Sequence, residues 1–227
     1  IVIHQVYELW FKLLLHEADA LGRRLSADDL HGAIATLQRL RAVMKTLVGQ
    51  LDVLETMTPR SFGSFRDRLD TASGFQSSQF RELEFAFGYK RSALVGAASP
   101  VPDTRRLKDR HEQPTVLDHW YAFLAHRGLA VPDRLRRRDV REPAGPDPDL
   151  QRELLRAYAE LPDLVLLFEL MLDFDEGFQE WRYRHVKVVE RTIGAKLGTG
   201  GSAGVEFLKA TLFRPLFADL WAIRQMM

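Results

Sequence analysis

The sequence contains no cysteine among its 227 residues. Disulfide bonds, metal sites built from thiolates, a nucleophilic thiol and covalent haem attachment through a C-x-x-C-H motif are therefore excluded. A chain without cysteine fits a reducing compartment, and we expect a cytoplasmic protein.

The chain also has almost no net charge and no long apolar run. Its 32 basic and 31 acidic residues give no electrostatic reason to expect nucleic acid or an anionic membrane as a partner. The basic cluster at 134–141 is predicted to be a solvated surface. The most apolar stretch, 164–174, contains acidic residues and is too short to span a bilayer. No signal peptide is recognisable, and because the sequence starts at Ile1 inside an apolar helical pattern, we expect a further segment before it.

The alternation typical of strands is missing as well, whereas helical spacing recurs along almost the whole chain. We predict an all-α fold, a single domain of antiparallel helices covering residues 1–227. Loops are expected at 89–114, with at most a short helix, and at 139–148. Ser26 and Asp29 have the spacing of a capping box, Thr58 precedes a proline as helix starts do, and Gly194 is a candidate C-cap. The expected helices follow Ser26, start at Thr58, and cover 75–88, 115–127, 149–160 and 162–194, with two short ones around Pro215.

Several catalytic motifs are absent. The glycine-rich segment GTGGSAG (198–204) lacks the GK[ST] ending and the preceding strand of a nucleotide-binding loop. Its glycines either let a small ligand approach the backbone closely or only make a flexible connection. H-E-x-x-H and E-x-x-H pairs are missing, and so is a G-x-S-x-G turn between a strand and a helix. The sequence therefore offers few candidates for chemistry.

One histidine lies on the apolar face of the longest predicted helix. Steps of three and four residues define this face, which holds Met171, Phe174, Phe178, Trp181, His185 and Val188. Burial favours the neutral imidazole, which is the form that ligates iron or zinc. A core histidine that is satisfied by a backbone carbonyl is the alternative, and spacing alone leaves both open.

An arginine stands in a similar position near the middle of the chain. Phe62, Arg66 and Leu69 share one helical face, so the guanidinium lies on an apolar stripe. A buried arginine needs an anionic partner, and the carboxylate of a ligand would serve. The alternative is that the side chain extends to the surface.

A third set of residues gives a weaker indication of function. His4, Glu8, Lys12 and His16 step by four along an otherwise apolar helix. From spacing alone, this pattern is typical of a solvated stripe and indicates no function.

Four segments of the chain together resemble the tryptophan 2,3-dioxygenase family, and they occur in the family's order. They are IHQVYELWFKLLLHE (3–17), VLETMTPRSFGSFRDRL (53–69), SGFQSSQFRELEF (73–85) and WRYRHVKVVERTIGAKLGTGGSAG (181–204). Residues 89–160 resemble the family poorly. The resemblance implies a haem b that is held non-covalently and is ferrous in the active form. It also implies a dioxygenase that inserts O2 across the indole C2–C3 bond of L-tryptophan to give N-formylkynurenine, the first step of tryptophan degradation by the kynurenine pathway. The implied assembly is a homotetramer, a dimer of dimers.

The resemblance also assigns roles to residues. His185 matches the axial ligand of the haem iron, while Arg66 and Thr199 match groups that hold the carboxylate and ammonium of the substrate. His4 matches the distal histidine that accepts a hydrogen bond from the indole N–H. This role replaces the interpretation of His4 as part of a solvated stripe, and His4 is the candidate catalytic residue. Phe62 stands where some members have tyrosine, so a hydroxyl contact to the carboxylate is absent here. Further positions match the walls of the substrate pocket: Ile1, Val2, Ile3, Leu69, Ser73, Gly74 and Trp181.

Two other functions stay open from the sequence. A gas sensor or haem carrier on the same scaffold would need none of His4, Arg66 and Thr199. A helical interaction scaffold without a cofactor would make the histidine and the arginine incidental.

Overall fold

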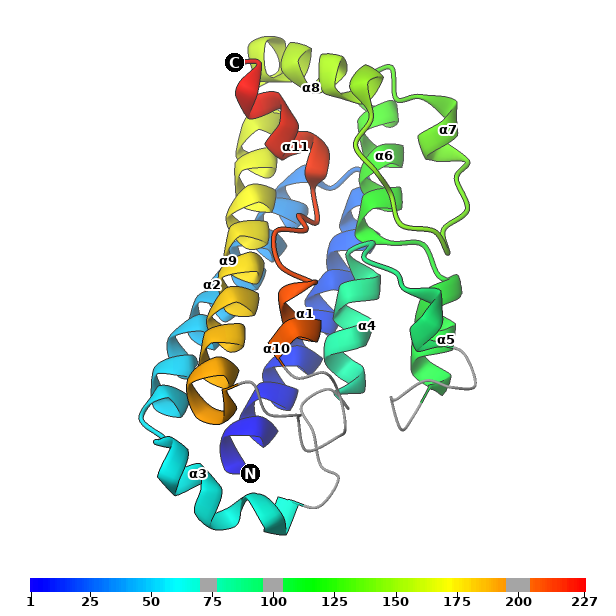
Figure 1. The fold of residues 1–227 in the computed structure, drawn as a ribbon. Helices are drawn as coiled ribbons and strands as arrows, with labels where there is room; N and C mark the ends of the chain where they lie inside the picture. Colours follow the sequence, from blue (N-terminus) through cyan, green and yellow to red (C-terminus); the bar gives the residue numbers. More distant parts are fainter. Residues whose placement is uncertain (70–76, 96–103, 195–204) are drawn as a thin grey trace.

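Three long helices form the centre of the molecule. The computed structural model describes residues 1–69, 77–95, 104–194 and 205–227, and every regular element in these ranges is a helix. The predicted all-α fold is therefore confirmed. Helix α2 (Leu30–Glu55) packs against both α1 (Val2–Ser26) and α9 (Pro162–Ile193). Figure 1 shows that α1 runs opposite to the other two, whereas α2 and α9 run in the same direction. The antiparallel arrangement thus holds for α1 and its long neighbours but not for the α2–α9 pair.

Shorter helices surround this centre. Helices α4 and α6 pack on α1, while α8 and α11 pack on each other and on α9. The N-terminus, α3 and the C-terminal ends of α2 and α9 lie at one end of the molecule, and α7, α8 and the C-terminus lie at the other (Figure 1). Among the helices described, none is long and apolar enough to cross a membrane. The bounds are α3 (Pro59–Arg66), α4 (Ser78–Ala86), α5 (Arg105–Glu112), α6 (Val116–His126), α7 (Asp133–Arg136), α8 (Pro148–Glu160), α10 (Val205–Lys209) and α11 (Ala218–Ala222).

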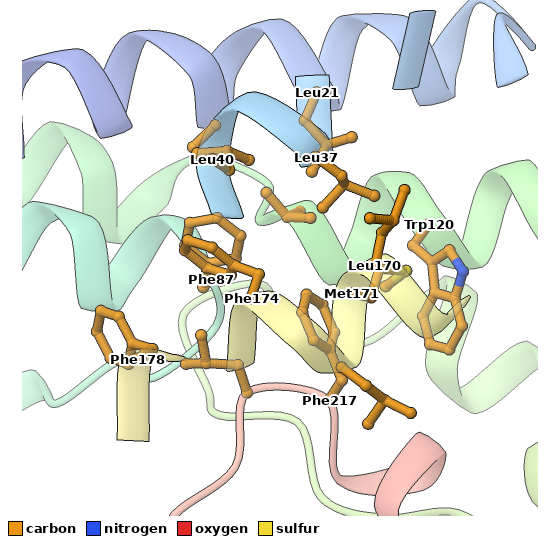
Figure 2. Close-up of a cluster of buried hydrophobic side chains, with 14 of the residues drawn as sticks. Leu21, Leu37, Leu40, Phe87, Trp120, Leu170, Met171, Phe174, Phe178 and Phe217 are labelled. Carbon is orange, nitrogen blue, oxygen red and sulfur yellow. The ribbon is translucent and has the colours of Figure 1, made fainter. Parts of the chain in front are cut away.

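The core forms where the apolar faces of these helices meet. Figure 2 shows side chains of α1, α2, α6 and α9 in one cluster, joined by Phe217 from the C-terminal segment. Each large apolar side chain that is removed from water stabilises the fold by roughly 1.5–3 kcal/mol. On α2, apolar residues that recur in steps of three and four are all buried: Leu37, Leu40, Met44, Leu47, Leu51 and Leu54.

Local chemistry sets the helix boundaries, with one correction to the sequence analysis. Thr58 caps α3 by accepting a hydrogen bond from the backbone N–H of Ser61 (3.1 Å), as expected. Gly194 ends α9 with a positive φ of 62°, also as expected. Ser26, in contrast, is the last residue of α1. The carboxylate of Asp29 caps α2, because the chain uses two intervening residues to turn between the helices.

The connections between helices differ from expectation in two places. The segment 89–114 agrees with the prediction of a loop with a short helix, since it contains the eight-residue α5 and a 3-10 turn at 92–94. Helix α7 was not predicted. The basic cluster at 134–141 is only partly a solvated surface, because Arg138 is largely buried and binds the carboxylate of Asp118 (2.7 Å). The loop at 139–148 is confirmed up to residue 147, since α8 begins at Pro148.

Candidate functional site

His185 lies in the C-terminal part of α9. The C-terminal end of this helix is at the same end of the molecule as α3 and the N-terminus (Figure 1). Part of its surface is accessible, yet protein atoms enclose most of the ring. Burial, followed by the positive charges of Arg81 and His4, lowers the pKa of His185 to about 4. No hydrogen bond reaches either ring nitrogen from the residues that the structure describes. The imidazole is therefore neutral at physiological pH, with nitrogen atoms that are free to ligate a metal.

The indole of Trp181 packs flat against this imidazole. The two rings are stacked, with centroids 5.1 Å apart and an angle of 9° between their planes. Trp181 is only 7% exposed, and it also contacts Tyr7, Phe11 and Phe80. The surroundings of His185 are thus aromatic and apolar on this side.

His4 comes from the first turn of α1. Its side chain is largely exposed, but burial of the remainder is the main cause that lowers its pKa below the ordinary value. Because its charge acts on the pKa of His185, the two histidines lie near each other. Ile1 and Val2 are exposed, whereas Ile3 is half-buried and packs against the core. Of these three predicted wall residues, only Ile3 is part of a packed surface.

Helix α3 carries the arginine predicted to bind a carboxylate. Phe62, Arg66 and Leu69 are all half-buried, and no residue of α3 is fully buried. Arg66 thus lies between the two alternatives that the sequence left open, a buried guanidinium and a side chain that extends to the surface, because α3 covers the end of the bundle instead of entering its core. Since α3 contacts α9, Arg66 and His185 lie on neighbouring elements. Thr199, Ser73 and Gly74, which were also predicted to belong to the site, lie outside the described residues.

A buried charge network next to His185 was missed by the sequence analysis. Glu84 on α4 is fully buried and binds Arg182 of α9 (2.8 Å), Arg81 (2.7 Å) and Arg91. Burial alone would raise the pKa of Glu84, but the three guanidinium charges outweigh it and hold the pKa below its ordinary value. Arg182 stands three residues before His185, so this network joins α4 to the part of α9 that carries the histidine. Only the alternation of charged and apolar residues in RELEF (81–85) hinted at it.

These features define a class of site. Among the described residues, no three His, Asp or Glu side chains are grouped as ligands for one metal ion. A neutral imidazole stacked on an aromatic ring instead suits a cofactor that needs a single protein ligand, as a haem iron does. The fold and the site thus describe a helical protein in which one histidine could serve as that ligand.

Comparison with known proteins leads to a family. The model of the tryptophan 2,3-dioxygenase family matches residues 1–129 and 153–227. Relatives with the name tryptophan 2,3-dioxygenase include that of Herpetosiphon aurantiacus, which is 50% identical over 224 residues (99% of this chain and 86% of the relative). Those of Anaeromyxobacter sp. (strain K) and Kineococcus radiotolerans are 48% and 40% identical, each over 99% of this chain and over 84% and 80% of the relative. The chain belongs to the tryptophan 2,3-dioxygenase family.

The match corrects one expectation. Residues 89–160 were predicted to resemble the family poorly, yet the family model includes residues up to 129 and again from 153. Only 130–152, which include α7 and the first turn of α8, lie outside it.

Proposed function

We propose that this chain is a haem-dependent dioxygenase that inserts O2 across the indole C2–C3 bond of L-tryptophan to give N-formylkynurenine. The observation that carries the proposal is the neutral imidazole of His185, which has no hydrogen bond to the described residues, in a member of this family. His4 lies near this imidazole, and Arg66 lies on α3, which contacts α9. Further parts of the proposal are haem b as the cofactor, a homotetrameric assembly and a cytoplasmic location.

The site fits a haem with one protein ligand. His185 would hold the iron, and the low pKa of its imidazole keeps a ring nitrogen available over the whole physiological pH range. When bound, the haem supplies the activation of O2, which no side chain of this protein performs. The protein contributes positioning, charge pairing and the exclusion of water.

His4 would orient the substrate's ring. Because burial lowers the pKa of this histidine, its imidazole is neutral near pH 7 and accepts a hydrogen bond from the indole N–H. It is an orienting group in this proposal and not an obligatory base.

Arg66 and Thr199 would bind the amino-acid end of tryptophan. A half-buried guanidinium is accessible to a ligand yet partly shielded from water, which strengthens a bidentate pair with a carboxylate. Phe62 supplies no hydroxyl, so the carboxylate depends on these two groups. Indole and tryptamine would leave Arg66 without a carboxylate, and the site therefore selects the complete amino acid.

The test is the formation of product by the haem-loaded protein. Hemin is supplied, the protein is reduced without oxygen, and O2 with L-tryptophan is then added while the near-ultraviolet absorbance of N-formylkynurenine is recorded. His185→Ala should abolish both stable haem binding and product, whereas the exposed His31→Ala on α2 should change neither. A protein without a Soret band after hemin addition would contradict the proposal. A normal haem spectrum without product would favour a sensor or a carrier.

A second test concerns the substrate's carboxylate. Arg66→Ala should raise KM for L-tryptophan by roughly 10–100-fold, the effect of losing one charged hydrogen-bond pair, while the haem spectrum is unchanged. Arg60→Ala is the matched control, because Arg60 is exposed on the same helix. Loss of haem in Arg66→Ala would count against the assignment.

A further inference from the structure

The orientation of a ligating histidine is usually fixed by a hydrogen bond from its second ring nitrogen. In most metal sites that nitrogen donates to a carboxylate or a backbone carbonyl. His185 has no such partner among the residues that the structure describes. Within the described structure a different contact has to hold the plane of its ring, because an imidazole without such a hydrogen bond can turn about its side-chain bonds.

The stack with Trp181 is the contact that can do this. The residues stand four apart on α9, where side chains lie one above the other on the same face. Their rings are nearly parallel, at 9° and 5.1 Å between centroids, which is within the range of favourable aromatic stacking. Rotation of the imidazole out of its plane would lose this face-to-face contact.

Trp181 is itself held in place from three sides. Its ring lies 4.7 Å from that of Phe80, 5.7 Å from that of Phe11 and 6.2 Å from that of Tyr7, the last two in edge-on arrangements. The hydroxyl of Tyr7 donates in turn to the carbonyl of Leu47 on α2. The indole is therefore wedged between side chains of α1 and α4, and the stack cannot swing away as a unit.

We infer that Trp181 is a positioning residue, which fixes the plane of the His185 imidazole relative to the haem. The inference rests on the proposed function, because it assumes that His185 ligates iron. It is a role in addition to the wall position that the family resemblance suggests for Trp181, whose indole is 7% exposed and contacts the rings of Tyr7, Phe11, Phe80 and His185. In this role the stacked ring matters more than the indole N–H.

The stack is tested first in the haem-free protein by NMR. The C–H resonances of the His185 imidazole should be displaced by the ring current of Trp181, and Trp181→Leu should remove this displacement. Trp181→Phe, which retains a ring, should keep part of it. An imidazole resonance that does not respond to Trp181→Leu would show that the rings do not stack in solution, which overturns the inference whether or not haem binds.

The positioning role is tested in the ferrous holoprotein without substrate. Resonance Raman spectroscopy records the iron–imidazole stretching band, and transfer to apomyoglobin measures the rate of haem loss. Trp181→Leu should broaden or shift the band and speed haem loss by roughly 3–10-fold, as expected for one stacking contact. Trp181→Phe should lie between this variant and the unmodified protein, and it serves as the test variant if Trp181→Leu does not fold.

Trp120→Leu is the matched control. Trp120 on α6 is 1% exposed and has the same size, but its neighbours are Tyr121, Phe168 and Phe217, and not His185. This variant should lower the stability of the fold and leave the Raman band unchanged. If the NMR test shows the stack but the band and haem loss are unaffected in Trp181→Leu, the positioning role is refuted while the proposed function stands. If the protein takes up no haem at all, both are refuted.

Discussion

Glu84 offers the sharpest test of how this fold is held together near the site. Its carboxylate is fully buried between guanidinium groups, and the structure pairs it with Arg182, which is 4% exposed. Glu84→Gln removes the charge with little change in shape. Arg182 then keeps a buried charge without its carboxylate partner, although its guanidinium still packs over the ring of Phe178 at 4.6 Å.

The expected loss of unfolding free energy is about 3–5 kcal/mol, which is typical when one partner of a buried ion pair is removed. This is a large part of the total stability of an ordinary domain. Urea unfolding followed by circular dichroism measures it. Glu206→Gln is the control: Glu206 pairs with Lys209 on an exposed surface, and its loss should cost under about 1 kcal/mol.

A double-mutant cycle separates the pair from other effects. Replacing both groups, as in Glu84→Gln with Arg182→Met, should cost less than the sum of the two single changes, because no unpaired charge is left between them. If Glu84→Gln lowers the unfolding free energy by less than about 1 kcal/mol, the cluster is hydrated or its arginines find other anions. The description of a buried network would then be wrong.

Two further predictions concern packing and pH. Gly177→Ala should lower the unfolding free energy by roughly 1–3 kcal/mol, because the new methyl group would lie 2.9 Å from Cγ of the buried Met44. Gly49→Ala is the control: no atom lies within 4 Å of the new methyl group, and the unfolding free energy should rise by about 0.5–1 kcal/mol. Equal effects of the two variants in thermal unfolding would refute the close approach of α2 and α9. Burial lowers the pKa of Lys90 to about 8, and its ammonium donates to the carbonyls of His111 and Gln113. The unfolded chain keeps this proton up to about pH 10.5, whereas the folded protein loses it near pH 8. The unfolding free energy of the protein, measured relative to that of Lys90→Met, should therefore increase by about 1–3 kcal/mol between pH 8 and 10.5. If the difference in unfolding free energy between the two proteins does not depend on pH, this pKa is wrong.

Regular apolar spacing made the long helices predictable. The steps of three and four along α9 define one apolar face, and the structure buries all of that face except His185, which is half-buried. The same spacing on α2 is buried as well. Proline after Thr58 and glycine at 194 act through local backbone geometry, so their effect did not depend on the rest of the fold. The prediction that Ser26 caps the second helix was wrong because serine and aspartate both cap helix N-termini. Only the length of the turn between α1 and α2 decides which of the two residues is the cap.

The sequence predicted the candidate site less completely than the helices. Spacing placed His185 and Trp181 on one face, but it could not show that their rings stack. The burial of Glu84 depends on α9 supplying Arg182 from 98 residues further along the chain. The exposure of α3, which leaves Arg66 only half-buried, likewise follows from tertiary packing that no local pattern encodes.

A titration of the ferric haem-loaded protein with L-tryptophan, followed through the Soret band, tests the central claim most directly. If His185 ligates the iron and Arg66 anchors the amino acid in the same site, tryptophan should shift the band in a saturable way. The apparent dissociation constant should then rise by roughly tenfold or more in Arg66→Ala, but not in Arg60→Ala. An unchanged response to tryptophan in Arg66→Ala would show that the two side chains serve different sites, and the account would be wrong.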